Sequence, residues 1–211
     1  MPYVPCFINM IFTDITTDTQ TTYSLKANEK RIFFLHNRPG DIEFRLAGTG
    51  SEARVFALFS LSGDTKIESR ITQIHLAPDT ASSLMGRSIL SDRSSLDWKG
   101  LIKIEKNASG SDGHQEMRNL LLSDDASALA IPSLEIENND VRCGHASATS
   151  APNRDSLFFL RSRGLSEPLA EHMLVEGFIN DMLERLPLSA EQKESIFQSV
   201  SKQLFNISPR K

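Results

Sequence analysis

Residues 55–76 read VFALFSLSGDTKIESRITQIHL, and this stretch decides the fold. It contains two apolar clusters, Val55–Leu61 and Ile67–Leu76, separated by the turn formers Ser62-Gly63-Asp64. Short apolar clusters that are bounded by turn-forming residues are typical of β-strands. We therefore predict two consecutive strands here, joined by a turn.

The same pattern continues on both sides of this stretch, from Tyr23 to Ile136. Apolar and polar residues alternate most clearly in Ile102-Lys103-Ile104-Glu105 and Leu134-Glu135-Ile136-Glu137, as expected for strands with one face in a core. The other clusters that we interpret as strands are Arg31–Leu35, Ile42–Leu46, Leu84–Leu90, Trp98–Ile104, Leu120–Leu122 and Leu129–Ile136. The body of the protein is therefore predicted to be mainly β.

The spacing of the clusters leaves two architectures open. From Leu58 onward their midpoints advance by roughly 14 to 19 residues, which suits either a β-solenoid or a β-sandwich. The dipeptides that favour two-residue hairpins are absent except at Asp112-Gly113, so a meander of tight hairpins is less favoured than strands joined by wider turns.

The two ends of the chain differ from this body. Residues 1–20 contain two early prolines and part of a threonine-rich stretch, and we expect them to be poorly ordered. Residues 21–150 form the predicted β body. Residues 151–211 show helical signals: Asp155 and Gly164 for the start and end of a short helix, Ser166 before Glu167-Pro168 for a second, and a capping box at Ser189 and Gln192 for a third.

Composition limits the function classes. The chain has 211 residues, 39% of them hydrophobic and 24% charged, and a formal net charge of -4. Charges of both signs are scattered along it, which gives no electrostatic footprint for nucleic acid or anionic lipid. No apolar run approaches the roughly 20 residues of a membrane span. Two cysteines far apart fit a reducing compartment, so we expect a cytoplasmic protein that binds neither nucleic acid nor membrane.

Cys143 and His145 are the most interesting candidates for chemistry. In a strand, residues two apart project from the same face about 6 to 7 Å from each other, so a thiolate and an imidazole could share one soft metal ion. A structural zinc site needs four such ligands, and the chain offers no second pair at the usual spacing. The alternative is a buried cysteine beside a surface histidine. His75 is expected to be a hydrogen-bonded structural residue.

Enzyme signatures are scarce. The Gly-x-Ser-x-Gly of a nucleophile elbow, two histidines four apart and a phosphate-binding loop are all missing. Asp124-Asp125, or Glu135 with Glu137, could act as paired carboxylates in glycoside hydrolysis, although acids in turns and alternating strands are usually just solvated. A solitary β-helix enzyme acting on polysaccharide is therefore the alternative function.

The predicted second helix has an unusually wide apolar face. Its main stripe includes Leu169, Met173, Phe178 and Met182, and further apolar residues lie beside that stripe. Such a helix buries two sides. The second side could contact a partner protein or be covered by the last helix, and the pattern leaves both open.

Ordered segments of this sequence resemble the SufB/SufD scaffold proteins of iron–sulfur cluster assembly. The resemblance covers about residues 70 to 186. The matching segments are His75–Ser83, Lys99–Ile104 with Gln115 downstream, Asn119–Ala126, Pro132–Ile136, Asp140–His145, Leu157–Leu165 and Gly177-Phe178. The Cys-x-His pattern at 143–145 is similar to the SufD branch, but Ala146-Ser147-Ala148 stands where the family usually shows Gly-Ala-Thr.

The resemblance implies a right-handed parallel β-helix followed by a C-terminal α-helical segment, and a non-catalytic scaffold in a complex of SufB, SufC and SufD. A SufB-like partner would meet the β-helix, and a SufC-like ATPase would dock on the C-terminal helices through Leu169, Met173, Phe178 and Met182. A homodimer is a further possibility. Cys143 and His145 would handle iron or a transient iron–sulfur cluster at the partner interface, with no cofactor held stably by the chain alone.

Overall fold

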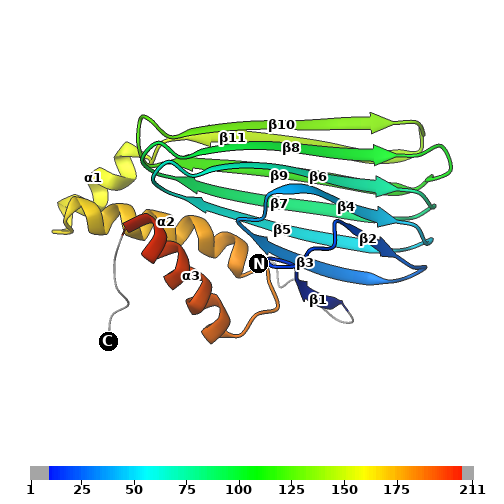
Figure 1. Cartoon of the computed structure of the whole chain (residues 1–211), viewed down its shortest axis with the longest axis horizontal. Coiled ribbons are helices and arrows are strands. Elements are labelled where there is room, and N and C mark those ends of the chain that lie inside the picture. The colour runs from blue at the N-terminus through cyan, green and yellow to red at the C-terminus, as the bar shows by residue number, and fades with distance from the viewer. Residues whose placement is uncertain (1–9, 206–211) are drawn as a thin grey trace.

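The computed structural model describes residues 10–205 and shows a parallel β-helix with three C-terminal helices (Figure 1). The apolar clusters Val55–Leu61 and Ile67–Leu76 correspond to β5 (Glu52–Leu61) and β6 (Lys66–His75). These two strands do not pair with each other. Instead β5 pairs with β3 and β7, and β6 with β4 and β8, always in parallel. Consecutive strands thus alternate between two sheets, which confirms the β-helix and rules out the sandwich.

Eleven strands of the described chain make up the two sheets. One sheet contains β1 (Ile11–Asp14), β3 (Lys30–His36), β5, β7 (Ala81–Leu90), β9 (Ser111–Leu121) and β11 (Val141–Ser150) in that order. The other contains β2 (Thr22–Leu25), β4 (Gly40–Leu46), β6, β8 (Ser95–Ile104) and β10 (Ser127–Ile136). We call them sheet A and sheet B.

Side chains that point between the two sheets form the main core. Tyr23, Phe33 and Phe44 make an aromatic cluster in the first turns of the coil, with ring centroids 4.7–5.5 Å apart, and Trp98 is fully buried further along. Regular alternation of buried and half-exposed residues is clearest in β8, where every second residue faces this core. Burial of such side chains is the main source of stability in a fold of this kind.

The first turn of the coil is closed by the chain itself. The buried Arg38 guanidinium donates to the carbonyl oxygens of Ile15 and Gln20 and to the Tyr23 hydroxyl, and Ile15 is fully buried. Within residues 1–20, which we expected to be poorly ordered, residues 11–14 form β1 and pair with β3. Residues 1–9 lie outside the described residues.

The three helices are α1 (Arg154–Ser162), α2 (Glu167–Leu183) and α3 (Ala190–Phe205). Asn153, not Asp155, caps α1, because its side chain accepts from the Ser156 amide. The predicted capping box is present: the Ser189 hydroxyl accepts from the Gln192 amide, and the Gln192 side chain accepts from the Ser189 amide. No described helix is long and apolar enough to cross a bilayer.

Helices α2 and α3 cover part of the outer face of sheet A, whereas α1 extends past the end of the β-helix (Figure 1). Val175, Ile179 and Met182 of α2 pack with Phe56 and Leu58 of β5 in a second core. No residue of α1 is buried. The helices α2 and α3 are thus an integral layer of the protein, and the last helix contributes Val200 to the same core.

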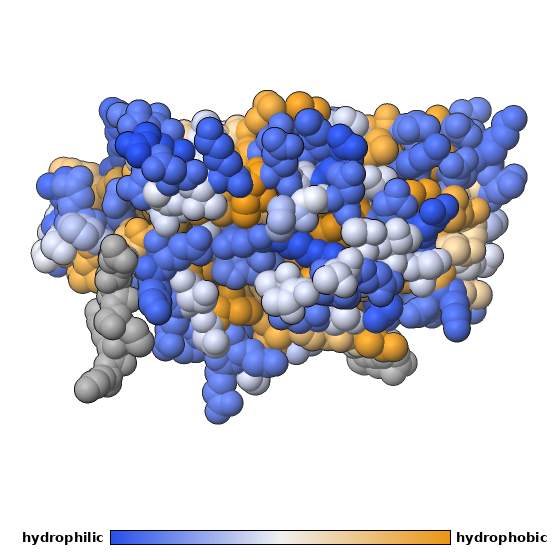
Figure 2. Space-filling model, viewed as in Figure 1, coloured by the Kyte–Doolittle hydropathy of each residue, from blue (hydrophilic) through white to orange (hydrophobic). Residues whose placement is uncertain are grey.

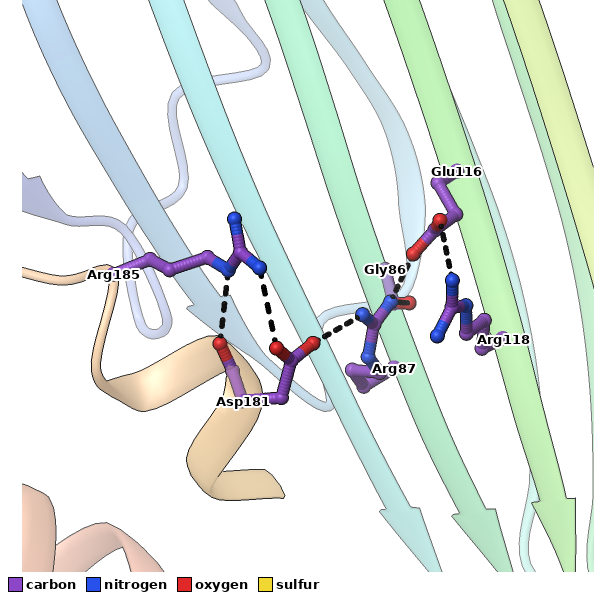
Figure 3. Close-up of polar contacts among 6 residues, drawn as sticks. All are labelled: Gly86, Arg87, Glu116, Arg118, Asp181 and Arg185. Atoms are coloured by element: carbon purple, nitrogen blue, oxygen red, sulfur yellow. Dashed lines mark hydrogen bonds and ion pairs between the residues drawn. The ribbon is translucent and has the colours of Figure 1, made fainter. Parts of the chain in front are cut away.

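A buried arginine fastens α2 to sheet A (Figure 3). The Arg87 guanidinium on β7 donates to Asp181 of α2 at 2.8 Å, to Glu116 of β9 at 2.7 Å and to the carbonyl oxygen of Gly86. Arg185 binds Asp181 and Arg118 binds Glu116, which extends the network at both ends. Charge-assisted hydrogen bonds are directional, so this network fixes the position of the helical layer on sheet A.

Candidate functional site at the open end of the β-helix

The last turn of the coil is open, in contrast to the first. Strands β10 and β11 are the final strands of sheets B and A, and each has ten residues with one edge that pairs with no other strand of the described chain. Unpaired strand edges of this length present rows of free backbone N–H and C=O groups to a partner strand.

Core-facing side chains are exposed at this end. Leu134 and Ile136 of β10 are in register with the fully buried Ile102 and Ile104, yet they are 37% and 43% exposed. On the outer face of the same strand, Leu129 and Ile131 are also exposed, and Figure 2 shows apolar surface along this edge. Exposed apolar residues that form a contiguous patch usually mark an interaction site.

Cys143 and His145 lie on the core-facing side of β11, at the rim of this opening. Cys143 is in register with Gly113 and packs beside Ile102 and Ile104, while His145 is in register with Gln115 and is exposed. Burial raises the pKa of the Cys143 thiol, although a hydrogen bond from the Gly144 backbone opposes that shift. The thiol is therefore protonated near neutral pH, and a metal ion would have to displace its proton.

A buried polar cluster lies beneath the cysteine. The His75 ring bonds the Thr80 hydroxyl through Nδ1 and the Ser82 hydroxyl through Nε2, each at 2.8 Å, and Thr80 also bonds Ser111. Burial lowers the pKa of His75 to about 4, so its ring is neutral at pH 7. This confirms His75 as a hydrogen-bonded structural residue. In the part of the chain that the structure describes, no three metal-binding side chains lie together, so a four-ligand site would need ligands from outside the described residues.

The four residues predicted to dock an ATPase are not equivalent. Met182 is fully buried against sheet A, and Phe178 is half-buried in the same core. Leu169 is half-buried, and Met173 is 44% exposed. The sequence analysis missed Phe158 and Phe159 of α1, which are 74% and 55% exposed.

The acids considered for glycoside hydrolysis do not form a site. Asp124 and Asp125 are exposed residues of a turn, and Glu135 forms an ion pair with Lys103 at 3.1 Å. Three other carboxylates, Glu52, Asp112 and Glu116, line a groove on sheet A, but each forms an ion pair with at least one arginine. A general acid needs a carboxyl group that is free to hold a proton.

Comparison with known proteins identifies the family. The family model described as "SUF system FeS cluster assembly, SufBD core domain" matches residues 36–178. An iron–sulfur cluster assembly SufBD family protein of Mycobacterium tuberculosis H37Rv is 34% identical over 175 residues, covering 75% of this chain and 44% of the relative. Relatives with the same family name occur in Mycobacterium leprae (32% identical; 76% and 43% covered) and Synechocystis (29% identical; 68% and 30% covered). The chain spans less than half the length of these relatives, and it belongs to the SufBD family of iron–sulfur cluster assembly proteins.

Proposed function

We propose that this chain is a SufD-like, non-catalytic scaffold subunit that acts in the cytoplasm with a SufB-like scaffold and a SufC-like ATPase. The observation that carries the proposal is the open last turn of the β-helix, where the core-facing Leu134 and Ile136 are exposed beside Cys143 and His145. A second β-helix that paired with β10 and β11 would bury these apolar side chains and satisfy both strand edges.

The difference between the two ends of the coil favours association of two subunits over formation of a filament. Among the described residues, the first turn leaves only the four-residue strands β1 and β2 at the ends of the sheets, whereas β10 and β11 have ten residues each. The last turn is therefore the larger surface for pairing with another subunit. Association through one end of each subunit stops at two, whereas open edges at both ends would allow filaments. A second copy of this chain could occupy the same surface, and measuring the mass of the isolated chain by light scattering distinguishes a homodimer from a monomer that awaits its SufB-like partner.

Docking of the ATPase is proposed at the free surface of α1 and the start of α2. Phe158, Phe159 and Met173 are the exposed apolar residues there, whereas Met182 is committed to the core of the protein. Large aromatic side chains that are exposed together are frequent anchors of protein interfaces.

Co-purification with SufB-like and SufC-like proteins tests these two surfaces separately. We expect Ile136→Glu to abolish recovery of the SufB-like partner and to leave the SufC-like partner bound, because a charge would be buried without a counter-ion at the open end. We expect Phe158→Glu to have the opposite effect. The control is Ile11→Glu, on an apolar residue that is 58% exposed at the closed end and should leave both partners bound. Retention of both partners by both test variants would refute the assignment.

Cys143 and His145 are proposed to ligate iron or a nascent cluster, with further ligands from the SufB-like partner. Thiolate and imidazole are suitable iron ligands, and both side chains here face the opening. We expect Cys143→Ser and His145→Ala each to lower cluster delivery by the reconstituted complex at least about tenfold, since losing one ligand weakens metal binding. Delivery is followed by reactivation of an apo iron–sulfur enzyme. If delivery were unchanged while the complex stayed intact, the chain would bind its partners without handling iron.

A further inference from the structure

A groove of about 720 Å³ runs along the outer face of sheet A, on the part that the helices leave uncovered. Its floor is built from β5, β7 and β9. One wall is the outer side of β11, where Gly144 and Ala146 are too small to fill the space, and the other includes Arg185 at the end of α2. This volume is in the range of small-molecule sites, which is about 300–1,000 Å³.

The three carboxylates of this groove already lie next to nitrogen groups, although Asp112 Oδ1 accepts no hydrogen bond. Each oxygen of its three carboxylates lies within 3.3 Å of a cationic or imidazole nitrogen. Glu52 contacts Arg54 and Lys30, Asp112 contacts His114 and Arg142, and Glu116 contacts Arg87 and Arg118. A cationic ligand would therefore have to displace an existing ion pair.

The donor groups, by contrast, are in excess. Strand register places Arg54, Ser83 and His114 side by side on β5, β7 and β9. Arg54 and Arg185 each use only two of their three guanidinium nitrogens, and within the described residues nothing bonds the hydroxyl of Ser83. Figure 3 shows the unused nitrogen of Arg185 pointing away from Asp181.

The network of ion pairs in and around the groove contains more cationic than anionic side chains. Its cationic side chains are Lys30, Arg54, Arg87, Arg118, Arg142 and Arg185. Its anionic side chains are Glu52, Asp112, Glu116 and Asp181. Six against four gives a local excess of positive charge on a chain whose net charge is -4. Arginine, serine and histidine in one groove suit carboxylate and phosphate groups.

We propose that this groove binds a small organic anion that carries two or more carboxylate or phosphate groups, with Arg54, Arg185 and Ser83 as its contacts. The proposed contacts lie on the outer face of sheet A, although the groove borders the open end at His145 and β11. A ligand here would touch both β11 and the end of α2, the elements next to the two proposed partners.

Isothermal titration calorimetry of the full chain with citrate and with pyrophosphate tests the proposal and distinguishes the two chemistries. We expect one ion bound per chain, with affinity lowered about tenfold or more by Arg54→Gln and by Arg185→Gln, since each removes charged hydrogen bonds to the ion. The matched control is Arg45→Gln: Arg45 pairs with Glu43 on sheet B as Arg54 pairs with Glu52 on sheet A.

Each outcome decides the question. Tighter binding of citrate assigns a carboxylate ligand, and tighter binding of pyrophosphate a phosphate ligand, provided that Arg45→Gln binds like the unmodified chain. Equal weakening by all three substitutions would mean non-specific attraction to positive charge and would overturn the proposal. Failure of both ions to bind at millimolar concentration would overturn it as well. Circular dichroism of each variant verifies that the fold is retained.

Discussion

Gly48→Ala is expected to lower the free energy of unfolding by about 4 kcal/mol. This is the largest effect that we predict for the addition of a single methyl group. Gly48 lies in the turn after β4, which stacks directly on the turn after β2. The Gly48 amide donates to the carbonyl oxygen of Leu25 at 3.1 Å. A Cβ atom at this position would lie 1.9 Å from the backbone nitrogen of Ala27 and 2.3 Å from the carbonyl carbon of Lys26.

The size of the effect follows from what the new atom would meet. A flexible side chain can move aside, but here the obstacle is backbone, and relieving the contact would separate two successive turns of the coil. Urea denaturation measures the change, and the closest control is Gly177→Ala in α2, where a Cβ would meet nothing within 4 Å. Because alanine favours helices, we expect that control to gain about 0.5–1 kcal/mol. A loss below about 1 kcal/mol for Gly48→Ala would show that the turns after β2 and β4 are not in close contact.

The strands in the middle of the chain could be predicted because their environment is regular. Strand β5 faces the main core on one side and the helices on the other, so its sequence is an almost continuous apolar cluster. Strand β8 has only one buried face, which gives the alternation seen at Ile102–Glu105. Both patterns are local and can be recognised without knowing the partner strand.

The strands that line the site could not be predicted in the same way. Strand β9 starts with Ser111, Asp112 and Gly113, which are typical of turns, because its core-facing side packs against the polar cluster around His75. Strand β11 consists largely of small and polar residues after His145, and these residues are exposed in the described structure. Polar packing and missing neighbours both remove the hydrophobic signal on which strand prediction depends.

The features that could not be predicted from the sequence depend on contacts between residues far apart in the chain. The choice between solenoid and sandwich depended on which strands pair, and here each strand pairs with the next but one. Cys143 and His145 were predicted on one strand face from their spacing, and the structure places both on the core-facing side. The groove joins residues from Glu52 to Arg185, so no short motif reveals it. For α2, the sequence showed a wide apolar face but not which half would pack on sheet A.

The buried His75 should make the stability of the protein fall as the pH is lowered from 6.5 to 4. In the folded chain burial holds the pKa of this imidazole at about 4, whereas an unfolded chain has a histidine pKa near 6.5. Below pH 6.5 the unfolded state takes up a proton that the folded state does not, which favours unfolding. The loss grows until the pH reaches the folded pKa and amounts to about 3 kcal/mol.

His75→Gln isolates this contribution from that of the carboxylates, which also titrate in acid. The substitution loses hydrogen bonds to Thr80 and Ser82 and is expected to destabilise the protein at pH 7. Because glutamine does not titrate, the gap in unfolding free energy between the unmodified chain and His75→Gln should narrow by about 3 kcal/mol between pH 7 and pH 4. Between pH 7 and pH 9 the gap should stay constant, since the imidazole is then neutral in both states. A gap that is equally wide at pH 4 and pH 7 would mean that the folded protein admits the proton, and that the polar cluster beneath Cys143 is open to water.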